Sequence, residues 1–103
     1  MINYHRGESI LILGEQRYVL VPSFKVLVGI EGELNCSVLD LISKISRGQF
    51  LQLKEMEVVI RHSLSKPIDC DLMDLIYQDG VIKIFPQIVN FLKNALNIEE
   101  SYE

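Results

Sequence analysis

The side chains best suited to metal binding or nucleophilic chemistry in this sequence are two histidines and two cysteines: His5, His62, Cys36 and Cys70. A structural zinc site uses ligand pairs such as C-x-x-C or H-x-x-x-H, because close neighbours lower the entropy cost of closing the site. No two of these four residues have such a spacing. The sequence therefore predicts no zinc site.

The same residues could in principle supply a nucleophile. A cysteine thiol becomes one when an imidazole lies within hydrogen-bond reach and a third group orients that imidazole. The sequence leaves open whether His62 approaches Cys36 or Cys70, but half-buried thiols and a surface histidine on a helix explain these residues more simply. We therefore predict no catalytic residues and no enzyme.

Acidic and glycine clusters point to no ligand either. Asp69, Asp71 and Asp74 lack the D-x-D-x-D-G spacing of a calcium loop. Aspartates that complement a helix dipole explain them without a metal. Gly29 and Gly32 belong to no phosphate-binding motif, and the glutamates beside them would repel a phosphate. We expect no metal, nucleotide or other cofactor.

Length and composition describe an ordinary globular domain. The chain has 103 residues, of which 49% are hydrophobic and 23% charged, and its net charge is −4. One domain is the natural expectation at this length, and nucleic-acid binding is disfavoured because it depends on clustered Lys and Arg. We predict a single domain over residues 1–98, followed by an acidic, disordered tail at 99–103.

The sequence predicts no membrane span and no signal peptide. No segment reaches the roughly 18 consecutive apolar residues of a span. The N-terminal residues lead into a strand-like run that ends at Gly14, where a signal peptide would have an apolar segment and a small-residue cleavage site. We therefore expect a cytoplasmic protein.

The first part of the chain predicts a β-hairpin. Residues 9–13 and 17–21 are rich in β-branched and leucine side chains, and the turn residues 14–16 separate them. We assign these residues to one face: Ile10, Ile12, Tyr18 and Leu20. That face must pack on the rest of the chain, because an isolated hairpin is barely stable in water.

After Pro22 the apolar spacing changes from two residues to about 3.6, which predicts helices. The first predicted helix has this stripe: Phe24, Leu27, Val28, Glu31 and Leu34. Ser37 and Asp40 resemble a capping box that begins the second helix, and Gly48 ends it.

Three further helices complete the predicted fold. One covers residues 52–64 and buries Leu53, Met56, Val59, Ile60 and Leu64. A short one covers 71–77, with Asp69 or Asp71 as its cap. The last is expected to begin near Phe85, which places Pro86 in its first turn; the alternative is a longer helix that Pro86 kinks. The predicted class is α+β, an N-terminal β-hairpin followed by four to five short α-helices in a single domain.

The later helices carry more apolar residues than one narrow core stripe needs. Val58, Val59, Ile82, Ile84 and Phe91 indicate either a second core layer or an exposed patch used by a partner, and both interpretations stay open. The candidate partner contacts are Phe24, Ile84, Phe85, Ile88, Phe91 and Leu92.

Several short motifs occur in an order that is more specific than any one of them. They are Arg6-Gly7-Glu8 before the first strand, Gly14 in the turn, Tyr18-x-Leu20 in the second strand, Pro22-Ser23-Phe24 at the helix start and Ile30-Glu31 on that helix. This order resembles the gene transfer agent family of small phage-tail proteins. The resemblance covers about residues 6–96, although the later helices have Ile, Lys and Asn where the family is richer in Ala and Gly.

The resemblance implies a non-enzymatic role in building a phage-like tail, with other tail proteins as partners. A tube subunit needs strands that pair edge to edge in a ring, whereas a chaperone needs helical grooves. With one predicted hairpin and mostly helical spacing, the chain suits better a tail assembly chaperone that binds helical tape-measure segments. The first alternative is a structural tail tube component, which would be associated with the particle. The second is a generic helical interaction domain. Self-association through a free hairpin edge stays open in each case.

Overall fold

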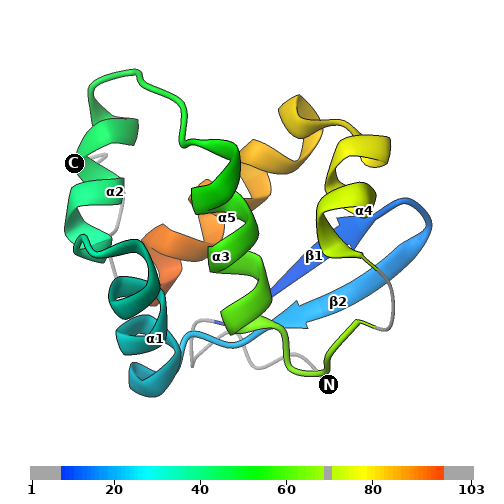
Figure 1. Ribbon diagram of the computed structural model, residues 1–103, viewed down its shortest axis with the longest axis horizontal. Helices are drawn as coiled ribbons and strands as arrows, with labels where there is room; N and C mark the ends of the chain where they lie inside the picture. The colour runs from blue at the N-terminus through cyan, green and yellow to red at the C-terminus, as the bar shows by residue number, and fades with distance from the viewer. Residues whose placement is uncertain (1–7, 69–70, 97–103) are drawn as a thin grey trace, which may run out of the picture.

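The N-terminal alternation forms a two-stranded antiparallel hairpin, as predicted. In the computed structural model, which describes residues 8–68 and 71–96, β1 (Ser9–Leu13) pairs with β2 (Gln16–Leu20) (Figure 1). Gly14 opens the turn with a φ of 63°, a left-handed conformation that glycine adopts without strain.

The predicted hydrophobic face of the hairpin is wrong for β1. These residues face the core: Leu11, Leu13, Tyr18 and Leu20. Ile10 and Ile12 lie on the opposite face, and Ile12 is exposed. The physical reason is the turn: with only Gly14 and Glu15 between the strands, every pair joins an odd-numbered residue to an even-numbered one, as Leu11 with Tyr18.

Five helices follow the hairpin in the described part of the chain. They are α1 (Phe24–Leu34), α2 (Val38–Ser46), α3 (Leu53–Ser63), α4 (Leu72–Asp79) and α5 (Val81–Ala95). The predicted caps are confirmed, since Ser37 and Asp40 form a capping box on α2, and the Asp71 side chain accepts the backbone N–H of Met73 in α4. The α+β class, with the hairpin first and the helices after it, is confirmed as well.

The predicted stripe of α1 is right only in part: Leu27 and Leu34 pack against the core. Ile30 is its buried residue, whereas Phe24 is 82% exposed and Val28 49%. Helix α1 packs on α3, and Gly29 faces a histidine ring of α3 so closely that a Cβ there would lie 2.8 Å from it. Glycine at this position, which has no side chain, allows the close approach of the two helices.

Helix α5 begins earlier than predicted. It starts at Val81, directly after Gly80, and contains Pro86 in its interior. A proline there removes the backbone hydrogen bond to the carbonyl four residues earlier, that of Ile82. Pro86 and Ile82 are both exposed, so water can bind that carbonyl in place of the missing donor. Ile84 is buried, and its contacts with the core keep the first turn of the helix in place.

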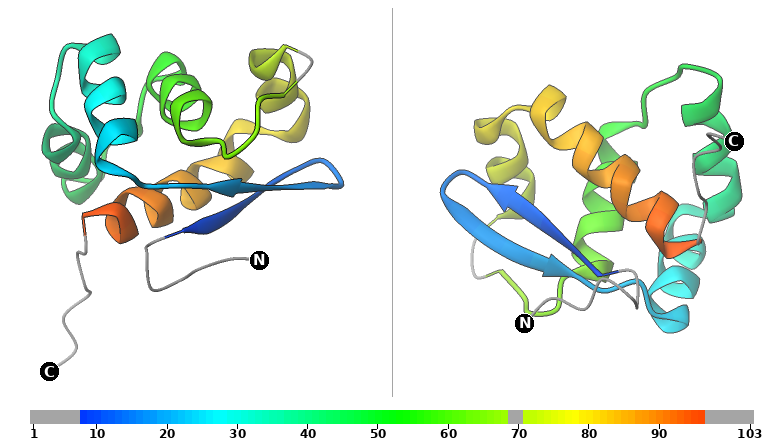
Figure 2. Two further views of the ribbon diagram at one scale, coloured as in Figure 1. Left: turned by 90° about the horizontal axis from the view of Figure 1, so that it is seen from below. Right: turned by 180° about the vertical axis from the view of Figure 1, so that it is seen from behind.

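The helices and the hairpin form two layers. Helices α1 to α4 lie side by side in one layer, and α5 and the hairpin lie together in the other (Figure 2). The core between them is built around residues that are fully buried, including Leu11, Leu20, Ile30, Met56, Ile60, Ile84, Ile88 and Phe91. The predicted tail at 99–103 lies outside the described residues.

Both edges of the hairpin are covered by other parts of the chain. On β1, the Gln87 side chain accepts the backbone N–H of Ile12 at 2.8 Å and donates to its carbonyl at 3.3 Å. On β2, residues 63–65 at the end of α3 form a bridge centred on Leu64. Ser65 donates its backbone N–H to the Val19 carbonyl at 2.9 Å, and Val21 donates its own to the Ser63 carbonyl at 2.7 Å. The chain itself therefore occupies part of the hydrogen-bonding potential at the edge of each strand.

Candidate functional site

Exposed apolar side chains gather where α3, α4 and α5 meet. Tyr77 is 81% exposed, Leu53 61% and Met73 51%. They line a hollow of about 150 Å³ together with Glu57, Ile76 and Val81. Large apolar side chains around a hollow are typical of a site that another molecule covers.

A second hollow lies farther along α3. Its volume is about 260 Å³, and it is lined by Glu57, Arg61, Leu64, Pro67, Ile68 and Leu72. Glu57 lines both hollows, so together they follow α3 on the side that faces α4. We call them the α3–α4 groove. At 1.5 Å per residue, its length from Leu53 to Leu64 is about 16 Å, or three helical turns.

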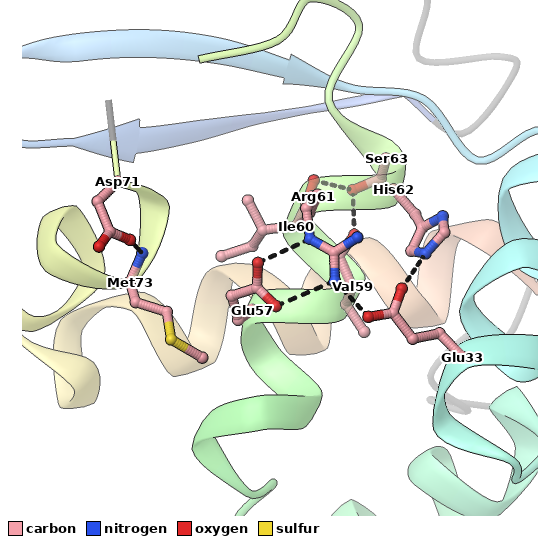
Figure 3. A network of polar contacts seen from close by, with 9 residues as sticks. All are labelled: Glu33, Glu57, Val59, Ile60, Arg61, His62, Ser63, Asp71 and Met73. Atoms are coloured by element: carbon pink, nitrogen blue, oxygen red, sulfur yellow. Dashed lines mark hydrogen bonds and ion pairs between the residues drawn. The ribbon is translucent and has the colours of Figure 1, made fainter. Parts of the chain in front are cut away.

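An ion-pair network fixes the polar side of this groove. Arg61 donates from Nε to Glu57 at 2.8 Å, also forms an ion pair with Glu33 of α1, and thereby spans the two helices (Figure 3). His62 shares a hydrogen bond of 2.8 Å with the other oxygen of Glu33. Hydrogen bonds from Arg61 and His62 lower the pKa of Glu33 to about 2, and the bonds with Glu57 and Glu33 raise the pKa of Arg61. Arg61 is therefore shared by two carboxylates, that of Glu57, which lines the groove with it, and that of Glu33 on α1.

The residues considered for catalysis or metal binding are not brought together in the described part of the chain. Cys36 is half-buried, and burial raises the pKa of its thiol, which makes the nucleophilic thiolate scarcer. The ring of His62 bonds to Glu33. Among residues 8–68 and 71–96, no three His, Cys, Asp or Glu side chains are grouped so that they could hold a metal ion. His5, Asp69 and Cys70 lie outside the described residues.

The predicted partner contacts fall into two groups. Four of them are fully buried and form the core of this chain, so they present no surface to a partner: Ile84, Ile88, Phe91 and Leu92. The helical spacing that identified them is the spacing of a core stripe. Phe24 is exposed, and Phe85 is half-buried with its ring centroid 4.8 Å from that of Phe50. For Phe24 and Phe85, partner binding stays a prediction.

The sequence interpretation missed the groove residues. Leu53 was expected in the core, whereas it is exposed, and Met73 and Tyr77 were not singled out. A signal was present, because Met73 and Tyr77 stand four residues apart on α4 and share the exposed face with Asp74. The two valines of α3 that left the interpretation open, Val58 and Val59, are buried in the core.

The motif residues within the described range have identifiable structural roles. Gly14 forms the hairpin turn, Leu20 enters the core, and Ser23 caps α1. Glu31 accepts the backbone N–H of Val38 at 2.8 Å and so binds the start of α2 to α1. Tyr18, Pro22 and Glu8 are half-buried, and Arg6 and Gly7 lie outside the described residues.

Comparison with known proteins yields one match. The family model described as phage tail tube protein, GTA-gp10, matches residues 6–97. The chain belongs to this family. The expected resemblance to gene transfer agent tail proteins is thus confirmed, and the family description names a structural tail protein and no enzyme. No curated protein and no solved structure matches the chain.

The family description bears on the choice between the two tail roles. It names a tail tube protein, which fits the alternative of the sequence analysis better than its main interpretation, the assembly chaperone. The described residues include no helix with the length and apolar character needed to span a membrane.

Proposed function

We propose that this member of the family is a tail assembly chaperone, which binds a helical segment of the tape-measure protein in the α3–α4 groove. The observation that carries the proposal is the groove itself. It is about three helical turns long, as estimated from the rise per residue, and exposed Leu53, Met73 and Tyr77 surround its apolar end. A groove of this kind suits the apolar face of an amphipathic helix.

The covered hairpin edges support this role over that of a tube subunit. Subunits that close a ring by strand pairing need free backbone N–H and C=O groups at the edges of a sheet. Here Gln87 occupies the edge of β1 at Ile12, and the 63–65 segment occupies the edge of β2. These contacts occupy part of each edge of the two-stranded sheet.

The tail tube subunit is the second candidate, and the family description favours it. In that role the protein would be abundant in finished particles and would associate with further copies of itself. As a chaperone it would act in the bacterial cytoplasm and be absent from the particle. Neither role involves catalysis or a cofactor.

The experiment has two arms. The protein is co-expressed with overlapping tape-measure fragments from the same gene cluster, and each fragment is tested for co-purification. Particles from the same cluster are purified and examined by quantitative mass spectrometry. A chaperone retains at least one fragment and is absent from the particles. Presence in the particle at the copy number of the tube, with no fragment retained, would overturn the proposal in favour of the tube subunit.

A further inference from the structure

The segment that covers the edge of β2 leaves this strand before it reaches the hairpin turn. In the antiparallel bridge, Leu64 lies opposite Leu20. Continued for three residues, the same pairing would place Pro67 opposite Arg17. Proline has no backbone N–H to donate, so it cannot continue the ladder. Ser65 is the last described residue of this segment that bonds to β2, and the edge beyond it is left uncovered.

The backbone groups of Arg17 point toward this uncovered part of the edge. Arg17 pairs with Ile12, whose N–H and C=O bond to the Gln87 side chain instead of to β2. In such a pair the backbone groups of the two residues point to opposite edges of the sheet, so those of Arg17 point away from β1. No described residue forms a hydrogen bond with them. One donor and one acceptor are therefore available to a further strand at this position.

A hollow of about 190 Å³ lies at the same place. It is lined by residues of β2 and of the segment that leaves it: Arg17, Tyr18, Val19, Leu64, Ser65 and Lys66. Arg17 and Lys66 are both exposed, and neither forms an ion pair with a described residue. The lining includes no acidic residue, and the nearby turn residue Glu15 pairs with neither cation. Two positive charges without a carboxylate partner in the described chain thus border one hollow.

We propose that the open part of the β2 edge binds an extended, acidic segment of a partner protein, which adds a strand at Arg17 and places an Asp or Glu side chain between Arg17 and Lys66. In strand addition, backbone hydrogen bonds supply affinity, and hollows for alternate side chains supply specificity. A hollow of about 190 Å³ is smaller than the roughly 300–1,000 Å³ of sites that take a whole small molecule, and it suits a single side chain. The inference concerns β2 and not the α3–α4 groove, so it does not depend on the proposed function.

Other occupants match this surface less well. A phosphate or a nucleic acid would pair with the two cations but would leave the N–H and C=O of Arg17 without a strand partner, and the net charge of −4 disfavours nucleic acid. A symmetric pairing of two β2 edges centred here would place Arg17 opposite its own counterpart. Like charges directly opposite each other destabilise a strand pair. An acidic extended peptide satisfies both the backbone groups and the charges.

The test uses three labelled peptides of about eight residues, a typical strand length. All three alternate valine with threonine, and they carry glutamate, glutamine or lysine at the same two alternate positions. Binding to the full chain is measured by fluorescence anisotropy. The glutamate peptide is expected to bind at least about fivefold more tightly than the glutamine peptide, and the lysine peptide should bind most weakly. Raising the salt from about 50 to about 500 mM should shrink these differences.

Neutral substitutions and amide exchange locate the bound strand. Arg17→Gln and Lys66→Gln should each weaken the glutamate peptide about threefold and leave the glutamine peptide unchanged. Lys54→Gln is the matched control, because Lys54 is exposed, lies outside this hollow and carries the same charge; it should change nothing. In the complex with the glutamate peptide, hydrogen exchange at the Arg17 amide should slow at least about tenfold, because a strand partner now accepts its N–H.

Each contrary result overturns the inference in a different way. Equal binding of the glutamate and glutamine peptides, or equal loss in Lys54→Gln, would show that Arg17 and Lys66 do not select an acidic side chain. Binding without slower exchange at the Arg17 amide would exclude strand addition. Displacement of the glutamate peptide by inorganic phosphate at matched ionic strength would point to a small anion instead. Tighter binding of a single-stranded oligonucleotide that Arg17→Gln weakens would point to a nucleic acid, and a dimer that protects the Arg17 amide without peptide would point to a second copy.

Discussion

The contact between Gly29 of α1 and His62 of α3 gives a stability prediction whose size follows from the structure. A Cβ at position 29 would lie 2.8 Å from Nδ1 of His62 and 3.1 Å from its Cε1, closer than nonbonded atoms tolerate. The ring must move in Gly29→Ala, and it then loses its hydrogen bond to Glu33. The same substitution removes a glycine from a helix interior, which favours folding by about 1 kcal/mol.

These two effects nearly cancel in the wild-type background. The hydrogen bond that His62 loses is partly solvent-exposed, and such a bond contributes about 1 kcal/mol. Gly29→Ala should therefore change the free energy of unfolding by less than about 0.5 kcal/mol. In a His62→Ala background the clash is absent, and Gly29→Ala should stabilise the protein by about 1 kcal/mol. The coupling energy between the two positions is then about 1 kcal/mol.

The assay is a double-mutant cycle by urea denaturation, followed by circular dichroism. Gly32→Ala is the matched control on the same helix, because a Cβ at Gly32 meets no atom within 4 Å. It should stabilise both backgrounds equally, by about 1 kcal/mol. Equal stabilisation by Gly29→Ala in the two backgrounds would refute the argument, since it would mean that the two residues do not touch.

Three further predictions concern other parts of the fold. The pKa of Glu33 is lowered to about 2, so its carboxylate stabilises the fold above its ordinary pKa, and this contribution is lost as the pH falls toward 2. In Glu33→Gln, the free energy of unfolding measured at a series of pH values should therefore fall less steeply toward acid pH than in the wild type. An equally steep fall would contradict the role of this group. Gln87→Ala removes both bonds to Ile12, so it should cost about 2 kcal/mol and, because it uncovers the edge of β1, increase self-association in sedimentation experiments. Asn90→Ala, exposed on the same helix, should do neither. Phe91→Ala should lower the free energy of unfolding by about 3–5 kcal/mol, because it empties a core position. Phe24→Ala should change thermal stability little, because Phe24 is exposed. Similar costs would show that the assignment of these two residues to core and surface is wrong.

Local signals in the sequence were sufficient for the type and order of the elements. The change of apolar spacing at Pro22 separates strand from helix, and Ser37, Asp40 and Asp71 supply side-chain caps that need only neighbouring residues. Such interactions lie within one turn of the chain, so they depend little on the rest of the fold.

The errors have tertiary causes. The core face of β1 depends on the length of the turn, and a shift of one residue moves Ile10 and Ile12 to the other side of the sheet. The core face of α1 depends on its packing against α3, which buries Ile30, a residue outside the predicted stripe. Pro86 lies inside α5 because the exposed side of the helix tolerates a missing hydrogen bond. None of these conditions is visible in a spacing pattern.

The groove was missed for a related reason. In a sequence, an apolar residue of a core stripe and one that lines a groove have the same spacing. Phe91 and Tyr77 are both aromatic residues of amphipathic helices, but Phe91 is fully buried and Tyr77 is 81% exposed. Only the packing of α3, α4 and α5 decides which of them a partner can reach.

The hairpin edges determine what a tube role would require of this chain. To pair β1 and β2 with neighbouring copies, the chain would have to break two bonds from Gln87 to Ile12 and two bonds from β2 and its extension to the 63–65 segment. At about 1 kcal/mol each, this costs about 4 kcal/mol before any intersubunit pair forms. New strand pairs in a ring would have to exceed that cost. The α3–α4 groove needs no such rearrangement, because Leu53, Met73 and Tyr77 are already exposed.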